Sequence, residues 1–218
     1  MSGTLKRAII ATAIAAAFLL AFTLTPPRGP RSMRSFDPDR LADLEIGMWQ
    51  AYYAKARVRL FALLVTLLHE QYRYSWAGAT REGFHLARAA ATFGDLRGGY
   101  EQVLPDLEAA YRQARDWTGA HFDPHAVARA ELAWWVARRV PGQNSPDEVG
   151  RLMADEYALL YETTADRVAR AALLRAEAGA LRDAQAAAGS QVDWDAIRRL
   201  LDASYRDLLA SLTLENAN

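Results

Sequence analysis

Residues 36–49 read FDPDRLADLEIGMW, and this stretch predicts a helical fold. Asp37 can accept hydrogen bonds from the first free backbone N–H groups of a helix. Pro38 suits the first helical position because its fixed φ is already helical. Phe36 lies just before the cap and can pack on Leu41 as a hydrophobic staple. Beyond Leu41 the apolar residues recur at spacings of three and four, which is the period of an amphipathic helix.

The same motif returns 86 residues further on, as FDPHAVARAELAWW in residues 122–135, with six of fourteen positions identical. The identical pairs are Phe36/Phe122, Asp37/Asp123, Pro38/Pro124, Ala42/Ala128, Glu45/Glu131 and Trp49/Trp135. Shared capping chemistry explains the first three pairs but not the glutamate and tryptophan. Two interpretations stay open: two helices with the same cap, or a duplication into two related halves whose units start at residues 36 and 122.

Helix start and stop signals recur along the rest of the chain, and no stretch after residue 35 alternates apolar and polar residues as a strand would. The helices expected from these signals run over about 37–70, 75–94, 100–118, 122–140, 145–161, 164–188 and 193–212. Short connections imply antiparallel neighbours. The prediction for residues 36–218 is an all-α domain, an antiparallel bundle or a stack of helical hairpins with about six to seven helices.

The N-terminal segment is apolar. Residues 8–25, AIIATAIAAAFLLAFTLT, carry no charge and follow Lys6 and Arg7. At about 1.5 Å per helical residue they span about 27 Å, just enough to cross a bilayer. A cleaved signal peptide is the alternative, but two prolines follow the run and no clear A-x-A site precedes them. We expect residues 1–25 to be an uncleaved signal-anchor, one transmembrane helix of a single-pass membrane protein.

Residues 26–35 are rich in proline, glycine and arginine, so they cannot continue the helix and are expected to form a linker. Arg28, Arg31 and Arg34 would then lie at the membrane surface, against anionic headgroups. Positive charges flank the apolar run on both sides, but a short basic start ahead of a long domain favours a cytoplasmic N-terminus. The helical domain is therefore expected on the periplasmic or extracytoplasmic side of a bacterial envelope.

Composition excludes several classes of function. The chain has no cysteine, which excludes disulfides, zinc–thiolate sites and iron–sulfur clusters. After residue 35 it holds 21 basic against 26 acidic residues and no basic run, a balance unsuited to nucleic-acid phosphates. Motifs for phosphate-binding loops, nucleophile elbows, zinc proteases and c-type haem do not occur. We predict a protein that is not an enzyme, holds no cofactor and binds no nucleic acid.

Glu45 and Glu131 each precede a tryptophan by four residues, so carboxylate and ring share one helix face. One interpretation is a carboxylate held by an arginine; the other is that two related helices bring their glutamates to a shared site. Glu82 and His85 form an E-x-x-H pair, which resembles half of the carboxylate–histidine set of ferritin-like di-iron bundles. The resemblance covers four residues, and no second E-x-x-H occurs. These four side chains are the candidates for a metal or acid–base site.

Aromatic residues make up 10% of the chain, and several are adjacent in sequence. Tryptophan and tyrosine often anchor protein interfaces, so five of them are interface candidates. They are Trp49, Tyr53, Trp76, Trp134 and Trp135. Together with the lipid anchor they predict a membrane-anchored interaction module, an accessory or scaffold subunit bound to other membrane-protein subunits. The alternatives are a carboxylate/histidine metal-binding or acid–base enzyme and a small-molecule carrier with an aromatic-lined pocket.

Overall fold

The computed structural model describes residues 3–213, with side chains from residue 9 onward, and the regular elements in this range are all helical. The helices are α1 (Gly3–Leu24), α2 (Pro38–Tyr53), α3 (Arg57–Tyr72), α4 (Trp76–Asp95), α5 (Leu104–Thr118), α6 (Pro124–Ala137), α7 (Pro146–Leu160), α8 (Ala165–Ala187) and α9 (Trp194–Thr213). A 3₁₀ turn, η1 (Tyr100–Val103), precedes α5. The predicted all-α helical bundle is confirmed.

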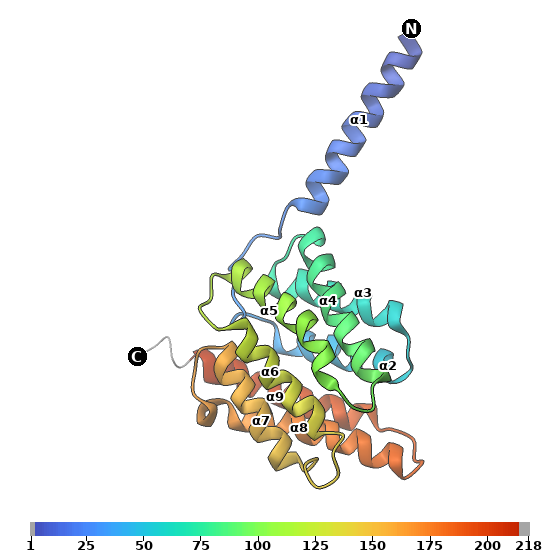
Figure 1. Ribbon diagram of the computed structural model, residues 1–218. Coiled ribbons are helices and arrows are strands. Elements are labelled where there is room, and N and C mark those ends of the chain that lie inside the picture. The colour runs from blue at the N-terminus through green and yellow to red at the C-terminus, as the bar shows by residue number, and fades with distance from the viewer. Residues whose placement is uncertain (1–2, 214–218) are drawn as a thin grey trace.

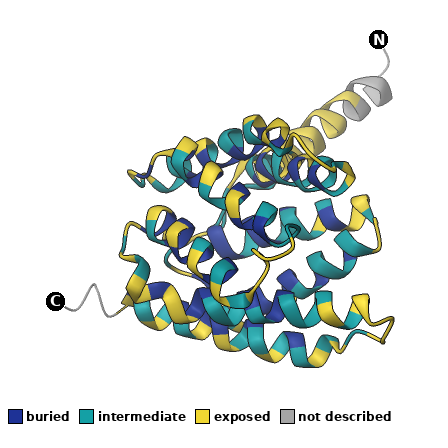
Figure 2. Cartoon of the chain, turned by 60° about the horizontal axis from the view of Figure 1, so that its bottom comes forward, coloured by how far each residue is buried: buried dark blue, intermediate teal, exposed yellow. Residues whose placement is uncertain are grey.

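Within the described part of the chain, α2 to α9 form a closed ring (Figure 1). Each of these helices packs against the next one along the chain, and α9 returns to pack against α2. The short connections make successive helices antiparallel, so the loops gather at two ends of the ring. Figure 2 shows the buried residues turned inward and the exposed ones on the outside. The helices therefore surround a common interior.

The two ends of the ring differ in what holds them together. At the end where the chain enters α2, which we call the linker end, Trp117 Nε1 donates to the carbonyl of Tyr72 at 2.9 Å. At the opposite end, which we call the mouth end, Arg138 pairs with Asp183 at 2.7 Å. Arg57 pairs with Asp95 at 2.6 Å at the same end.

The helix starts predicted from the sequence form as expected. Asp37 accepts from the backbone N–H groups of Asp39 and Arg40, and Asp123 accepts from that of His125. The phenylalanine before each of these caps is buried, as a hydrophobic staple requires. The two copies of the motif thus share their local geometry, and duplication of the chain stays a prediction.

The single helix predicted over 37–70 is wrong. The chain turns at residues 54–56, where Lys55 adopts a left-handed conformation with φ 53°, and continues as a separate helix, α3. No glycine or proline marks this turn in the sequence. A straight helix of that length would carry its second half away from the ring, whereas the turn lets α3 pack beside α2 and bury Leu60 and Leu68. The ring consequently has one helix more than the seven predicted segments.

The first helix, α1, extends away from the ring (Figure 1). Its apolar side chains are exposed on several faces, including Ile14 and Phe18, the latter 73% exposed. No helix among the described residues is long and apolar enough to cross a membrane, so the predicted transmembrane helix lacks support here. In the linker that follows, the Arg31 guanidinium lies 4.0 Å from the ring centroid of Trp117 and attaches this segment to the linker end.

Candidate ligand-binding site

Three adjoining cavities lead from the mouth end into the centre of the ring. We call them the outer, middle and inner cavities, with volumes of about 450, 400 and 240 Å³. The outer and middle cavities share Tyr52 and Arg139 among their lining residues. The middle and inner cavities share Glu45, Glu131 and Arg175. The interior is thus polar at its centre although helices surround it.

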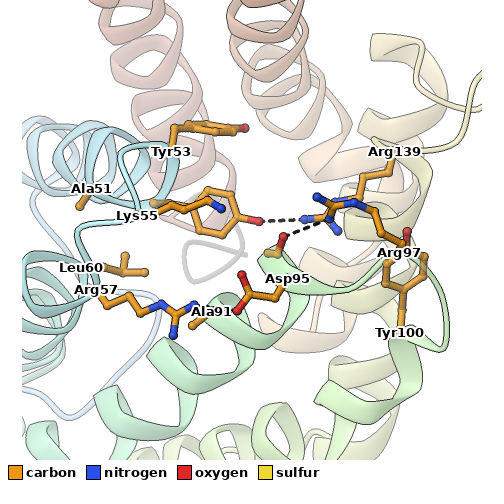
Figure 3. A pocket seen from close by; sticks show the side chains of 12 residues that line it. Ala51, Tyr53, Lys55, Arg57, Leu60, Ala91, Asp95, Arg97, Tyr100 and Arg139 are labelled. Carbon is orange, nitrogen blue, oxygen red and sulfur yellow. Dashed lines mark hydrogen bonds and ion pairs between the residues drawn. The ribbon is translucent and has the colours of Figure 1, made fainter.

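The outer cavity is cationic and open to solvent. Figure 3 shows its charged side chains, with Arg57 beside Asp95 on one wall and Arg139 and Arg97 on the other. The fifth charged side chain, that of Lys55, extends between the two walls. Four cations therefore face a single anion at the mouth. Arg139 is held in place, because its guanidinium donates to the hydroxyl of Tyr52 at 3.0 Å and to the carbonyl of Phe93 at 2.7 Å.

Glu45 is the most fully bonded carboxylate of the interior and is only 2% exposed. Arg175 donates to its Oε1 through Nε at 2.8 Å and Nη2 at 2.6 Å, and Trp49 Nε1 donates to the same oxygen at 3.1 Å. The Tyr205 hydroxyl donates to Oε2. These contacts join α2, α8 and α9 through one buried ion pair. Of the two interpretations offered for Glu45, the structure therefore has the carboxylate held by an arginine.

Glu131 and Glu156 lie on either side of one tyrosine. The Tyr111 hydroxyl is 2.8 Å from Glu131 Oε2 and 3.2 Å from Glu156 Oε1, and Trp134 Nε1 donates to Glu156 at 2.5 Å. One hydroxyl has one proton to donate, so both contacts form only if one carboxyl is protonated. Burial and the charge of Glu156 raise the pKa of Glu131, and burial raises the pKa of Glu156. The pair is thus suited to holding a proton near neutral pH.

Glu82 reaches the inner cavity from α4 and is 3% exposed. Burial raises the pKa of its carboxyl to about 8, against an opposing contribution from Tyr74. Among the described residues, neither Glu82 Oε2 nor the Tyr74 hydroxyl has a hydrogen-bond partner of normal geometry. A buried polar atom without a partner costs about 1–3 kcal/mol, so this position is one that a ligand or water would satisfy.

His85 does not join the glutamates. Its Nδ1 lies 2.8 Å from Asp106 Oδ1, and Arg88 pairs with the same carboxylate, so the E-x-x-H pair is divided between the interior and the surface side of α4. The other three sequence candidates, Glu45, Glu82 and Glu131, all line the inner cavity. No group of three or more His, Cys, Asp or Glu side chains among the described residues is close enough to hold a metal ion.

Four of the five aromatic residues proposed as interface anchors line the middle cavity. They are Trp49, Tyr53, Trp134 and Trp135. Trp76 instead stacks on His69 with 3.7 Å between ring centroids. Most of these aromatic side chains therefore line a cavity inside the ring.

Two functional candidates were missed by the sequence reasoning, Glu156 and Arg175. Glu156 follows Met153 by three residues and precedes Leu160 by four, and a glutamate inside an apolar stripe is a signal of a buried carboxylate. Arg175 carries no comparable signal, because nothing in its local sequence separates it from the many other arginines.

Comparison of the chain with protein-family models, with curated proteins and with solved structures finds no match.

Proposed function

We propose that the ring of helices binds a small molecule in its interior and acts as a carrier. The observation that supports this most directly is the set of adjoining cavities, the innermost of which is lined by Glu82, whose Oε2 makes no hydrogen bond of normal geometry among the described residues. Aromatic walls with a few convergent polar groups are the usual composition of a ligand pocket. A buried carboxyl without a partner costs stability, so a ligand that bonds to it would offset a cost already present in the fold.

The cavity is tested with 2-phenylethanol, a neutral aromatic molecule small enough for its inner part. We expect the full chain in detergent to bind it, seen as quenching of tryptophan fluorescence. Ala90 lines both the middle and inner cavities, so Ala90→Trp should fill the site and abolish binding. Ala169→Trp, on the exposed side of α8, is the matched control and should leave binding unchanged. Equal binding by both variants would refute an interior site.

We further propose that α1 holds this domain at a membrane, with the ring on the extracytoplasmic side. Residues 8–25 carry no charge, so this part of the chain presents only uncharged side chains to lipid. Its exposed apolar side chains would be costly in water at about 25 cal/mol per Å². Arg28 is exposed and follows the helix by four residues, close enough to meet lipid headgroups.

Membrane attachment is tested by fractionation of cells that make the full chain. We expect the protein in the membrane pellet after an alkaline wash, and we expect Ile14→Lys combined with Phe18→Lys to move it to the supernatant. Each central lysine costs about 2.5–3.5 kcal/mol of insertion free energy. Val58→Lys, at a residue on α3 that is 85% exposed, is the control and should stay in the pellet. Wild-type protein in the supernatant would contradict the proposal.

A second candidate function is that of an accessory or scaffold subunit, in which α1 packs against the helices of another membrane protein. The exposure of apolar side chains around α1 favours this, because a partner helix covers such a surface as well as lipid does. Extraction in mild detergent distinguishes the accessory subunit from the carrier. A stoichiometric partner that is lost with the Ile14→Lys and Phe18→Lys variant supports the subunit, whereas a monodisperse protein supports the carrier.

A further inference from the structure

We infer that the inner cavity takes an organic cation, an amine on a small aromatic or apolar body, with its ammonium group at Glu82. This inference rests on the proposed small-molecule function and names the class of molecule. It is carried by the excess of carboxyl groups over cations in the inner cavity and by Glu82 Oε2, which makes no hydrogen bond of normal geometry among the described residues.

The inner cavity holds more carboxyl groups than cations. Four glutamates line it, and Arg175 is the one cation among the lining residues. Arg175 makes both of its hydrogen bonds within this group to Glu45, so the other three carboxyls have only hydroxyl and indole donors as partners. A buried carboxylate without a countercharge costs several kcal/mol. A cationic ligand would supply the missing charge.

Glu82 marks where the ammonium group would be placed. Its Oε2 is buried and makes no hydrogen bond of normal geometry among the described residues, nor does the neighbouring Tyr74 hydroxyl, and Glu82 is one of the residues that line the cavity. An ammonium group offers three donors, so it can bond to Glu82 and to a second acceptor in the cavity wall. The side chain is held by helix α4, which fixes the position of this acceptor.

The walls of the cavity suit a molecular cation better than a metal ion. Tyr72, Tyr111 and Trp135 line it together with the glutamates, and aromatic faces attract ammonium groups. The carboxyls are distributed around these rings, and no three donor side chains among the described residues meet at metal-binding distance. An organic cation has the size to fill the aromatic space and the charge to reach the carboxyls.

The cationic mouth opposes entry of a cation, but the interior charges have the larger effect. Lys55, Arg57 and Arg97 at the mouth are exposed, and at physiological ionic strength exposed charges are screened over about 8 Å. Among the inner carboxyls, those of Glu45, Glu82 and Glu156 are buried and are screened much less. The mouth therefore affects the rate of entry mainly, while the carboxyls determine the affinity.

Binding of an ammonium group should displace protons from the cavity. The ionisable side chain next to Glu82 is Tyr74. Those that share the inner cavity with it are Glu45, Tyr72, Tyr111, Glu131, Glu156, Tyr157, Tyr161, Arg175 and Tyr205. Because the pKa of Glu82 is raised to about 8, its carboxyl is largely protonated below that pH. A cation needs the ionised form, so affinity should rise with pH between about 6 and 8, by up to about tenfold per unit for each proton displaced.

The experiment compares 2-phenylethylamine with 2-phenylethanol, which has the same shape but no charge, by titration of the full chain in detergent at pH 6, 7 and 8. At pH 8 we expect the amine to bind at least about tenfold more tightly than the alcohol. Glu82→Gln should remove most of this preference and flatten the pH dependence while the alcohol still binds, which also reports that the variant is folded. Glu148→Gln, at an exposed residue of α7, is the matched control and should keep the preference.

Three results would overturn the inference. If amine and alcohol bind equally well at pH 8 and Ala90→Trp abolishes binding of the alcohol, the small-molecule site stands but its preference for a cation is refuted. An amine preference that persists in Glu82→Gln would place the cation elsewhere. Failure of both molecules to bind in a manner sensitive to Ala90→Trp would remove the proposed function itself and the inference with it.

Discussion

Replacing Arg175 by methionine is expected to lower the free energy of unfolding by about 3–5 kcal/mol, because it leaves the Glu45 carboxylate buried without its countercharge. Arg175 makes two hydrogen bonds to Glu45, and the side chains are 16% and 2% exposed. Methionine keeps most of the apolar stem and removes only the charge and the donors. Urea denaturation of the full chain in detergent, followed by circular dichroism, measures the change.

Two variants test the cause of that loss. Glu45→Gln combined with Arg175→Met removes both charges, and it should recover a large part of the lost stability because no charge is left buried. Arg170→Met on the same helix is the matched control. Its side chain is 80% exposed and lies 3.7 Å from Asp207, so we expect little change. A double variant as unstable as Arg175→Met would show that packing, and not charge, dominates.

Replacing Glu82 by glutamine is expected to stabilise the ring, increasingly so as the pH rises. Folding raises the pKa of Glu82 to about 8 from an ordinary value of 4.5, so the folded protein holds a proton that the unfolded chain loses between these values. Its contribution to stability is thus fully present below about pH 4.5 and is lost as the pH rises toward 8. The loss is up to about 1.4 kcal/mol per pH unit.

Glutamine does not ionise, so it escapes this loss. We expect the free energy of unfolding of Glu82→Gln to exceed that of the wild type by about 2 kcal/mol or more at pH 7.5 and to differ little from it at pH 5. Glu148→Gln is again the control, because Glu148 is exposed and its pKa is lowered by Arg151. Thermal or urea unfolding at pH 5, 6.5 and 7.5 measures the difference. An advantage that does not grow with pH would contradict a buried, protonated Glu82.

The helices themselves could be predicted because their signals are local. Asp37 and Asp123 cap the first turns of α2 and α6, and Ser145 caps α7, as their positions in the sequence indicate. The turn at Lys55 could not be predicted in this way. Neither glycine nor proline marks it, and its left-handed conformation is favoured only because α3 buries apolar surface against its neighbours.

The candidate site was predictable in part. The repeated spacing to a tryptophan indicated Glu45 and Glu131 as candidates. The E-x-x-H spacing to His85 indicated Glu82, although His85 itself pairs with Asp106. Glu156 and Arg175 depend on contacts between helices far apart in sequence. The apolar stripe around Glu156 indicates that it is buried, but the partners of both residues leave no local signal, so only the packed ring reveals them.

By itself the sequence determined that this chain is helical, where most of its helices begin, and that residues 8–25 carry no charge, because caps and apolar spacings act over a few neighbouring residues. Only the tertiary structure decided that α9 closes on α2 and that four glutamates and one arginine meet inside the ring. Closure depends on the angles and contacts of all eight helices together. The environment of each carboxyl depends in turn on that closure, because burial and distant partners set its charge.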